Sequence, residues 1–222
     1  MSQSELSVII PAGPGERAWA SLVSRIPPDW PMLITAVDAR PRHLPEHIQW
    51  LHGRPGRGRQ LNAGAAAVSS HWLWFVHADS QLDPSSFSAV RAWCAQRGQG
   101  LGYLDLGFLP DGPRLTRLNA LGANLRSRWF GLPYGDQAFC VSAREFHALG
   151  GFRQDLQRGE DLDFVVRARA AGLPATRIGG RILTSARRYR EHGWWRTTWQ
   201  HQLNARRLIR QARSSPPAGP AP

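Results

Sequence analysis

The residues best suited to chemistry in this sequence are carboxylates near the ends of apolar runs, and Asp79 is the first of them. It follows the run 72–76, which is short, aromatic and β-branched, as is typical of a strand buried on both faces. Because the carboxyl ends of parallel strands open into the ligand crevice of an α/β sheet, we expect Asp79 to lie where ligands bind. A simple turn is the alternative, since Asp79 and Asp83 could end the strand and cap the next helix.

A second carboxylate, Asp161, stands in the first turn of a helix expected from residue 160 to about residue 171. Helical spacing puts Asp161 on one face with Val165 and Ala168, so this face is directed at the core. The positive end of the helix stabilises an ionised carboxylate, which suits a general base better than a general acid. The alternative is that Glu160, Asp161 and Asp163 only complement the helix dipole.

An arginine- and glycine-rich segment, residues 53–64, leads into an alanine-rich helix that ends near Ser69. Free backbone N–H groups and the dipole at a helix N-terminus favour negative charge, so the segment is a candidate anion cradle. It is not a Walker A loop, because it lacks the Gly-Lys-Ser/Thr ending. A basic surface loop is the alternative. Since the strand before Asp79 follows directly, the segment and Asp79 should lie at the same edge of the sheet.

Other strands and helices must position the two carboxylates and the arginine-rich segment. Apolar runs predict strands at 6–10, 32–37 and 47–51, with a helix at 16–25, and this alternation is typical of an α/β fold with a parallel sheet. Later elements are expected as strands at 102–109, after the polar tip 134–137, and at 178–184, and as helices at 84–97, 114–129, 143–149 and 193–213. With no internal repeat, we expect one domain over residues 1–213 and a disordered tail at 214–222.

The charge of the chain is unusual. The formal net charge is +12, and because the sequence has no lysine, all 28 basic residues are arginine. Such a surface favours anionic partners, which include nucleic acid, an anionic membrane and phosphate-bearing substrates. No secretory leader and no run of about 18 apolar residues is found, so we expect a cytoplasmic protein, with a peripheral contact at the inner membrane left open.

Two further features concern packing. Cys94 and Cys140 form no CxxC or Cys/His pattern, so we expect buried free thiols rather than a zinc site or a disulfide. In the last predicted helix an apolar stripe falls near one face and consists of Trp195, Trp199, Leu203 and Ile209. We expect this stripe to belong to the core, and an interfacial membrane contact is the alternative.

Several motifs together resemble the family 2 glycosyltransferases. They are Ser7–Pro11, Val37-Asp38, Gly58–Gly64, the metal-type motif His77-Ala78-Asp79, and Leu149–Phe152 followed by Glu160-Asp161 and Arg167. The small bacterial subgroup associated with radical-SAM and selenium-related domains is the most similar. The resemblance implies the GT-A fold, a three-layer α/β/α sandwich with a mostly parallel central sheet, and transfer of a sugar from a nucleotide-diphosphate donor to an acceptor hydroxyl.

The resemblance also implies roles for single residues. Asp161 would be the general base of an inverting reaction, and Asp79 with His77 would hold Mn²⁺ or Mg²⁺ against the diphosphate. The donor side would be formed by Pro11, Ala12, Glu16, Asp38, Arg59, Asn62, Ala78, Asp79 and Arg187. The acceptor side would be formed by Asp136, Gln137 and Glu160.

Two positions depart from the family pattern. His77 stands where the metal motif usually begins with an acidic residue, and an imidazole nitrogen suits manganese better than magnesium. Gly15 precedes Glu16 where relatives often carry Asn. His192 is expected as an exposed histidine rather than a ligand.

Two other classes of protein stay open. A sugar nucleotidyltransferase would share the chemistry, although its usual Gly-rich signature is absent at the first strand. A non-enzymatic, arginine-rich binder of nucleic acid or an anionic membrane would account for the charge. Under the leading hypothesis no specific nucleic acid partner is expected.

Overall fold

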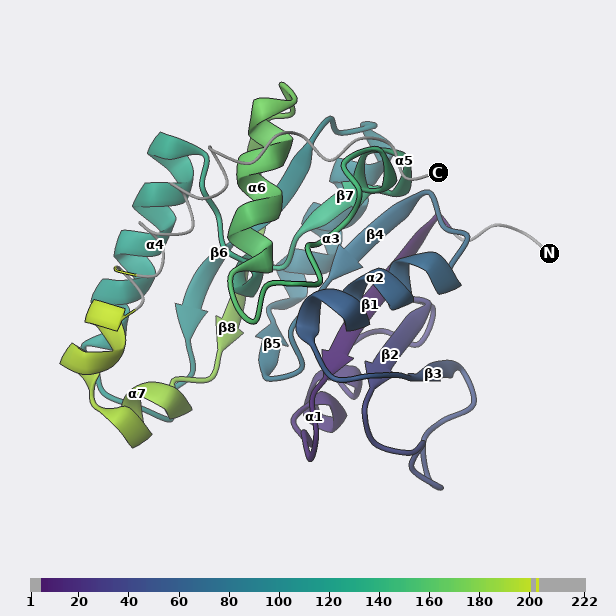
Figure 1. Cartoon of the computed structure of the whole chain (residues 1–222), viewed down its shortest axis with the longest axis horizontal. Coiled ribbons are helices and arrows are strands. Elements are labelled where there is room, and N and C mark those ends of the chain that lie inside the picture. Colours follow the sequence, from purple (N-terminus) through teal and green to yellow (C-terminus); the bar gives the residue numbers. More distant parts are fainter. Residues whose placement is uncertain (1–4, 201–202, 204–222) are drawn as a thin grey trace.

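A mixed sheet of eight strands forms the middle layer of the molecule (Figure 1). The computed structural model describes residues 5–200 and 203. The strands are β1 (Leu6–Ala12), β2 (Met32–Ala36), β3 (Ile48–His52), β4 (Trp72–Phe75), β5 (Ser80–Leu82), β6 (Leu101–Phe108), β7 (Cys140–Ser142) and β8 (Ala175–Thr184). They lie in the order β3-β2-β1-β4-β7-β6-β8-β5.

The first four strands pair in parallel. β1 lies between β2 and β4, and β2 also pairs with β3. The successive residues Val8, Ile9 and Ile10 are all fully buried, because β1 has apolar neighbours on both faces of the sheet. The βαβ pattern inferred from the sequence is confirmed in this half.

The other half of the sheet mixes both directions. β7 pairs antiparallel with β4 and β6, β5 pairs antiparallel with β8, and β6 and β8 are parallel. Taken over both halves, the sheet is mixed but mostly parallel, which confirms the predicted α/β fold class. Because β7 pairs with β4, the polar segment that precedes β7 is carried to the carboxyl end of β4.

Helices cover both faces of the sheet. They are α1 (Trp19–Val23), α2 (Arg57–Ala67), α3 (Pro84–Ala95), α4 (Thr116–Phe130), α5 (Ala143–Ala148), α6 (Glu160–Ala170) and α7 (Arg187–His192), with a short 3-10 helix η1 (Gly135–Gln137). Leu22 of α1 and Val90 of α3 join the core on one face, and Leu61 of α2 and Phe164 of α6 join the core on the other. Figure 1 shows α2 and α6 in front of the sheet and α3 behind it.

The structure corrects the start of α2. Residues 57–64 are helical, whereas the sequence predicted a loop there. Gly56 has a φ of 125°, which turns the chain directly before the helix. A Cβ on Gly58 would lie 2.7 Å from the carbonyl oxygen of Arg153, so the first turn of α2 packs closely against the segment before α6.

The segment after β4 also differs from the simple turn that was the alternative. Ser80–Leu82 forms β5, which pairs with the end of β8, a partner about a hundred residues later in the chain. The helix cap that this alternative placed at Asp83 is nevertheless present, since the Asp83 side chain accepts a hydrogen bond of 2.9 Å from the N–H of Ser85 at the start of α3.

The prediction that the last apolar stripe belongs to the core was wrong. Residues 194–200 and 203 are helical, but Trp195, Trp199 and Leu203 are 79%, 67% and 49% exposed. The helix meets α4 through polar contacts instead, because the Asn119 side chain bonds to Trp194 and Thr198. Ile209 and the predicted tail 214–222 lie outside the described residues.

Two smaller expectations can be compared directly. Cys94 and Cys140 are buried free thiols, as predicted. The fold brings their sulfur atoms to 3.9 Å from each other, which the sequence did not indicate. Within residues 5–200 and 203, the longest apolar helical stretch is too short or too polar to cross a bilayer.

Candidate active site

The carboxyl ends of β1, β2 and β4 share one edge of the sheet, and the predicted nucleotide side lies there. Pro11 and Ala12 are buried at the end of β1. Asp38, two residues after β2, accepts a hydrogen bond of 3.0 Å from the N–H of Gly15. Glu16 accepts hydrogen bonds of 2.9 and 2.8 Å from the two backbone N–H groups that follow it. These contacts fix the loop after β1 beside the end of β2.

Gln60 holds the same two strand ends together and was not predicted. Its side chain is buried and donates to the carbonyl oxygens of Ala12, at 2.7 Å, and Thr35, at 2.8 Å. The only signal in the sequence was its place inside the family-like segment Gly58–Gly64. By satisfying both carbonyls, Gln60 places the N-terminal half of α2 over the site edge.

Arg59 lies on the exposed side of this junction. It contributes to a cavity of about 200 Å³ whose other lining residues are Thr35, Ala36, Leu51, Gly53, Arg54, Gln60 and Ala63. The lining is mostly apolar, with two arginines at the rim. Such a pocket suits a flat apolar group that is joined to an anion.

Asn62 lies further along α2 and bonds to protein backbone. Its side-chain amide donates to the carbonyl oxygen of Phe152, at 2.8 Å, and its carbonyl accepts from the N–H of Phe152, at 2.9 Å. Arg167 of α6 donates to the carbonyl oxygens of Leu149 and Gly151 in the same turn. Asn62 and Arg167 therefore fix the turn that leads into α6.

Asp161 is held in one orientation at the start of α6. Its Oδ2 accepts a hydrogen bond of 2.7 Å from the N–H of Gly135, and its Oδ1 lies 3.8 Å from Nη2 of Arg57. Burial alone would raise the pKa of Asp161, but the Arg57 charge and the Gly135 hydrogen bond outweigh it and lower the pKa below its ordinary value. The carboxylate is therefore ionised, as the sequence predicted for this helix end.

Arg57 is a charged residue at the centre of the site, and the sequence did not predict its role. Its Nε donates to Glu160, whose side chain is only 2% exposed. The neighbouring acid on the same helix, Asp163, is also buried and pairs with Arg167 at 2.8 Å. These acids have specific arginine partners, so complementing the helix dipole is not their only role. The repeat of Arg and Gly at the start of α2 was the one available signal for Arg57.

His77 lies between these charges. A Cβ on Gly135 would be 3.1 Å from Nε2 of His77 and 3.0 Å from Oδ2 of Asp161, so glycine allows the two side chains to converge there. Burial, and after it the positive charge of Arg57, hold the pKa of His77 well below its ordinary value. The imidazole is therefore neutral at pH 7, which is the state that can ligate a metal ion.

Asp79 lies just past β4, with Ala78 buried beside it. Burial and the nearby Glu16 raise the pKa of Asp79, while Arg188 and Arg187 oppose this shift. Arg187, at the start of α7, reaches across the site edge, where its Nη2 lies 3.8 Å from Glu16. The chain thus brings carboxylates from the β1 and β4 ends together with two arginines from α7.

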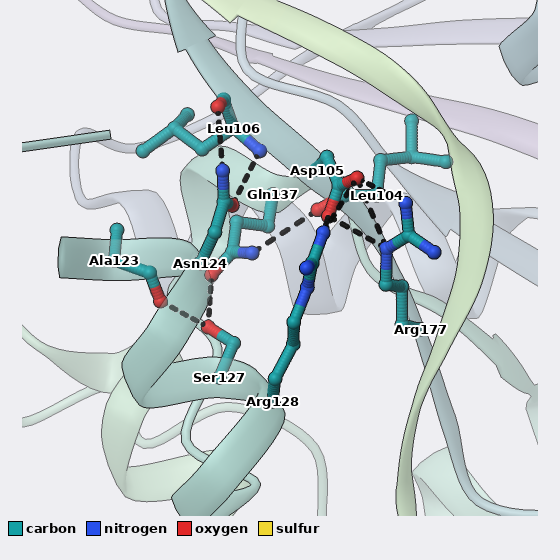
Figure 2. A network of polar contacts seen from close by, with 9 residues as sticks. All are labelled: Leu104, Asp105, Leu106, Ala123, Asn124, Ser127, Arg128, Gln137 and Arg177. Carbon is teal, nitrogen blue, oxygen red and sulfur yellow. Dashed lines mark hydrogen bonds and ion pairs between the residues drawn. The ribbon is translucent and has the colours of Figure 1, made fainter. Parts of the chain in front are cut away.

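Gln137 and Asp136 of η1 have different environments. Gln137 is fully buried, accepts from Ser127 Oγ at 2.7 Å and donates to the carbonyl of Leu104 at 3.1 Å (Figure 2). By contrast, Oδ1 of Asp136 is buried without a hydrogen-bond partner among the described residues. Burial, followed by the negative charge of Asp161, raises the pKa of Asp136 to about 6.

A complete metal cage is not formed by protein side chains alone. Within the described part of the chain, no three His, Cys, Asp or Glu residues are grouped so that they could hold a metal ion. Asp79 with neutral His77 offers a carboxylate and an imidazole at one strand end. A carboxylate and a neutral imidazole are both ligand types that divalent ions accept, and such ions can take further ligands from substrate phosphates and water.

The mixed sheet and its two helical layers define the fold. The chain has an α/β fold with a mixed, mostly parallel central sheet that matches GT-A glycosyltransferase structures. Neither a family model nor a curated protein sequence matches it.

Solved structures match it at low sequence identity. S. aureus TarS 1-349 in complex with UDP-GlcNAc is 12% identical with a TM-score of 0.60, and the match covers 82% of this chain and 58% of that one. The mannosyltransferase PcManGT from Pyrobaculum calidifontis, in complex with GDP-Man and Mn²⁺, is 14% identical with a TM-score of 0.57, covering 82% and 57%. The chain thus spans about three fifths of the length of these neighbours.

Proposed function

We propose that this chain is an inverting, metal-dependent glycosyltransferase that moves a sugar from a nucleotide-diphosphate donor to an acceptor hydroxyl. The observation that carries the proposal is the ionised Asp161 carboxylate, fixed by the N–H of Gly135 next to His77 and the end of β4. Membership of family 2, with its subgroup associated with radical-SAM and selenium-related domains, and a cytoplasmic location belong to the same proposal.

The proposed donor side is the shared edge of β1, β2 and β4. The base and ribose would lie along Pro11, Ala12, Glu16 and Asp38, with Arg59 at the rim of the neighbouring pocket. Asn62 would support this side from a distance through the Phe152 turn. Two structural neighbours support a nucleotide-sugar donor, because one carries UDP-GlcNAc and the other GDP-Man.

Asp79, with Ala78 and His77 beside it, would hold a divalent ion against the diphosphate. Mn²⁺ or Mg²⁺, when bound, neutralises charge on the leaving diphosphate. Mn²⁺ is favoured by the neutral imidazole of His77, and it is the ion found with PcManGT. Arg187 would add positive charge on the opposite side of the phosphates.

Asp161 would act as the general base. In a single displacement, the acceptor oxygen bonds to the anomeric carbon while the bond from that carbon to the diphosphate oxygen breaks. The hydroxyl proton passes to Asp161, and the nucleoside diphosphate leaves with the bonding electron pair. The Gly135 hydrogen bond engages Oδ2, so Oδ1 is the oxygen we assign to the acceptor proton.

The acceptor side would be formed by Asp136, Gln137 and Glu160 in different ways. Asp136 is the group we assign to direct contact, because its Oδ1 has no partner among the described residues. Gln137 and Glu160 are engaged with Leu104 and Arg57, so they would position the site rather than touch the acceptor.

The test is a thermal-shift series with UDP, GDP and their sugars, with and without Mn²⁺. A ligand that binds the folded state raises the melting temperature with its occupancy. We expect metal-dependent stabilisation by one nucleotide in the wild type and none in Asp79→Ala. Equal stabilisation in both would contradict the metal assignment.

Asp161→Asn tests the base separately. We expect unchanged donor binding and a loss of transfer of about a hundredfold to ten-thousandfold, because the amide cannot accept the proton. The control is Asp155→Asn, an exposed acid in the segment before α6, which should transfer at the wild-type rate. If the protein instead releases pyrophosphate from a nucleoside triphosphate when a sugar phosphate is supplied, it is a nucleotidyltransferase.

A further inference from the structure

α4 carries two opposite faces, and only one of them packs on the protein. Its buried side chains recur at helical spacing and are Thr116, Ala120, Ala123 and Ser127. At about 100° per residue, Leu118, Leu121, Leu125 and Trp129 fall on the opposite side. Leu118, Leu121 and Trp129 are 57%, 56% and 73% exposed. α4 therefore presents an apolar stripe away from the sheet.

The helix at 194–200 extends this apolar surface. Asn119 of α4 bonds to Trp194 and Thr198, which sets the two helices side by side. Trp195, Trp199 and Leu203 follow at intervals of four residues and are exposed. In the described part of the chain, every strongly exposed large hydrophobic side chain lies on or beside these two helices; they are Leu115, Leu118, Leu121, Trp129, Phe130, Trp195, Trp199 and Leu203.

Positive charge predominates around this surface. α4 and residues 193–203 contain no acidic residue. Exposed arginines flank the apolar stripe and are Arg114, Arg117, Arg190 and Arg196, while the exposed Arg128 pairs with Asp105 of β6. Exposed Trp and Leu ringed by arginine is the composition of an interfacial helix that meets anionic lipid. A symmetric contact between two copies would set the same arginines against each other, which is unfavourable.

We propose that the outward faces of α4 and of the helix at 194–200 bind the surface of an anionic lipid bilayer. Trp129, Trp195 and Trp199 lie at the headgroup boundary, where the indole ring is preferred, and the arginines pair with lipid phosphates. The chain lies on the bilayer and does not cross it. The proposed membrane binding does not depend on glycosyl transfer, so the vesicle experiment tests it separately from the proposed reaction.

The experiment is co-sedimentation of the full chain with vesicles of phosphatidylglycerol and phosphatidylcholine, compared with vesicles of phosphatidylcholine alone. We expect binding to the anionic vesicles only, with a bound fraction that falls as salt rises. The variant Leu118→Gln/Leu121→Gln/Trp129→Gln should partition about tenfold or more weakly, because it removes apolar area that enters the bilayer. All three side chains are exposed, so its melting temperature should match the wild type.

Charge is tested with a matched pair of arginines. Arg117→Gln, beside the stripe, should weaken vesicle binding more than Arg25→Gln, an exposed arginine after α1. Equal binding of the triple variant and the wild type overturns the proposal, as does the absence of binding to anionic vesicles. A dimer lost in the triple variant, without vesicle binding, would assign the surface to a second copy. Vesicle binding that occurs only after residues 204–222 are deleted would assign the surface to that segment as its occupant in the full chain, and would overturn the proposal.

Discussion

At the residue scale, the site depends on two carboxyl groups whose pKa values are shifted in opposite directions. Asp161 accepts a hydrogen bond from Gly135 and faces Arg57, and its pKa is lowered. Asp136 is buried without a partner for one oxygen, and its pKa is raised to about 6. Groups with divergent pKa values at one site are typical of acid–base chemistry. The raised pKa of Asp136 also makes the stability of the protein depend on pH.

Asp136→Asn is expected to stabilise the protein at pH 7. Between its ordinary pKa of 3.8 and about 6, the folded protein keeps a proton that the unfolded chain releases, so this carboxyl group lowers stability as pH rises. The uncharged amide removes this dependence and should raise the free energy of unfolding by about 1–3 kcal/mol at pH 7, with little gain near pH 4. Urea unfolding at both pH values measures it. Asp155→Asn, whose carboxyl pKa is lowered, should show no such gain.

At the element scale, α2 and α4 each contain a glycine, and the two glycines have different surroundings. A Cβ on Gly64 of α2 would lie 2.5 Å from Cγ2 of Ile9 and 3.0 Å from Cγ2 of Thr35, so α2 can approach β1 and β2 only with glycine there. Gly122 of α4 has no atom within 4 Å of its added Cβ. The close approach of α2 is what lets Gln60 reach two strand ends.

Replacing each glycine by alanine should therefore shift stability in opposite directions. Gly64→Ala is expected to lower the free energy of unfolding by about 1–3 kcal/mol, because the added methyl overlaps the β1 core. Gly122→Ala should raise it by about 0.5–1 kcal/mol through helix propensity. Chemical denaturation of both variants provides the measurement, and a stabilised Gly64→Ala would contradict the packing described for α2.

At the scale of the whole molecule, the positive charge and the specific site should respond differently to salt. With a net charge of +12, the chain should bind RNA or DNA weakly and non-specifically, with an affinity that falls steeply as salt rises. The nucleotide-sugar stabilisation should persist at physiological salt, because buried charges are screened less. Filter binding and thermal shift across a salt series compare the two. RNA binding that resists salt, without nucleotide protection, would favour a nucleic-acid binder.

Much of the architecture could be predicted from the sequence. Buried parallel strands need continuous apolar runs, so β1, β2 and β4 were visible as such, and the Asp83 cap followed from local backbone chemistry. The ionised state of Asp161 was also expected from its helix N-terminus, which favours negative charge, but the charge of Arg57 and the N–H of Gly135 lower its pKa in the folded protein. For the strands and the Asp83 cap, the cause lies within a few residues along the chain.

Only the tertiary structure decided the contacts between distant segments. β5 was missed because its partner lies in β8, and Arg57 was missed because its partners stand on α6. The stripe of Trp195 and Trp199 has the spacing of a core face, yet Asn119 draws the helix onto α4 through its other side. Periodicity shows that a helix has an apolar face. Which face is buried depends on the neighbour it packs against, and that is set by the fold of the whole chain.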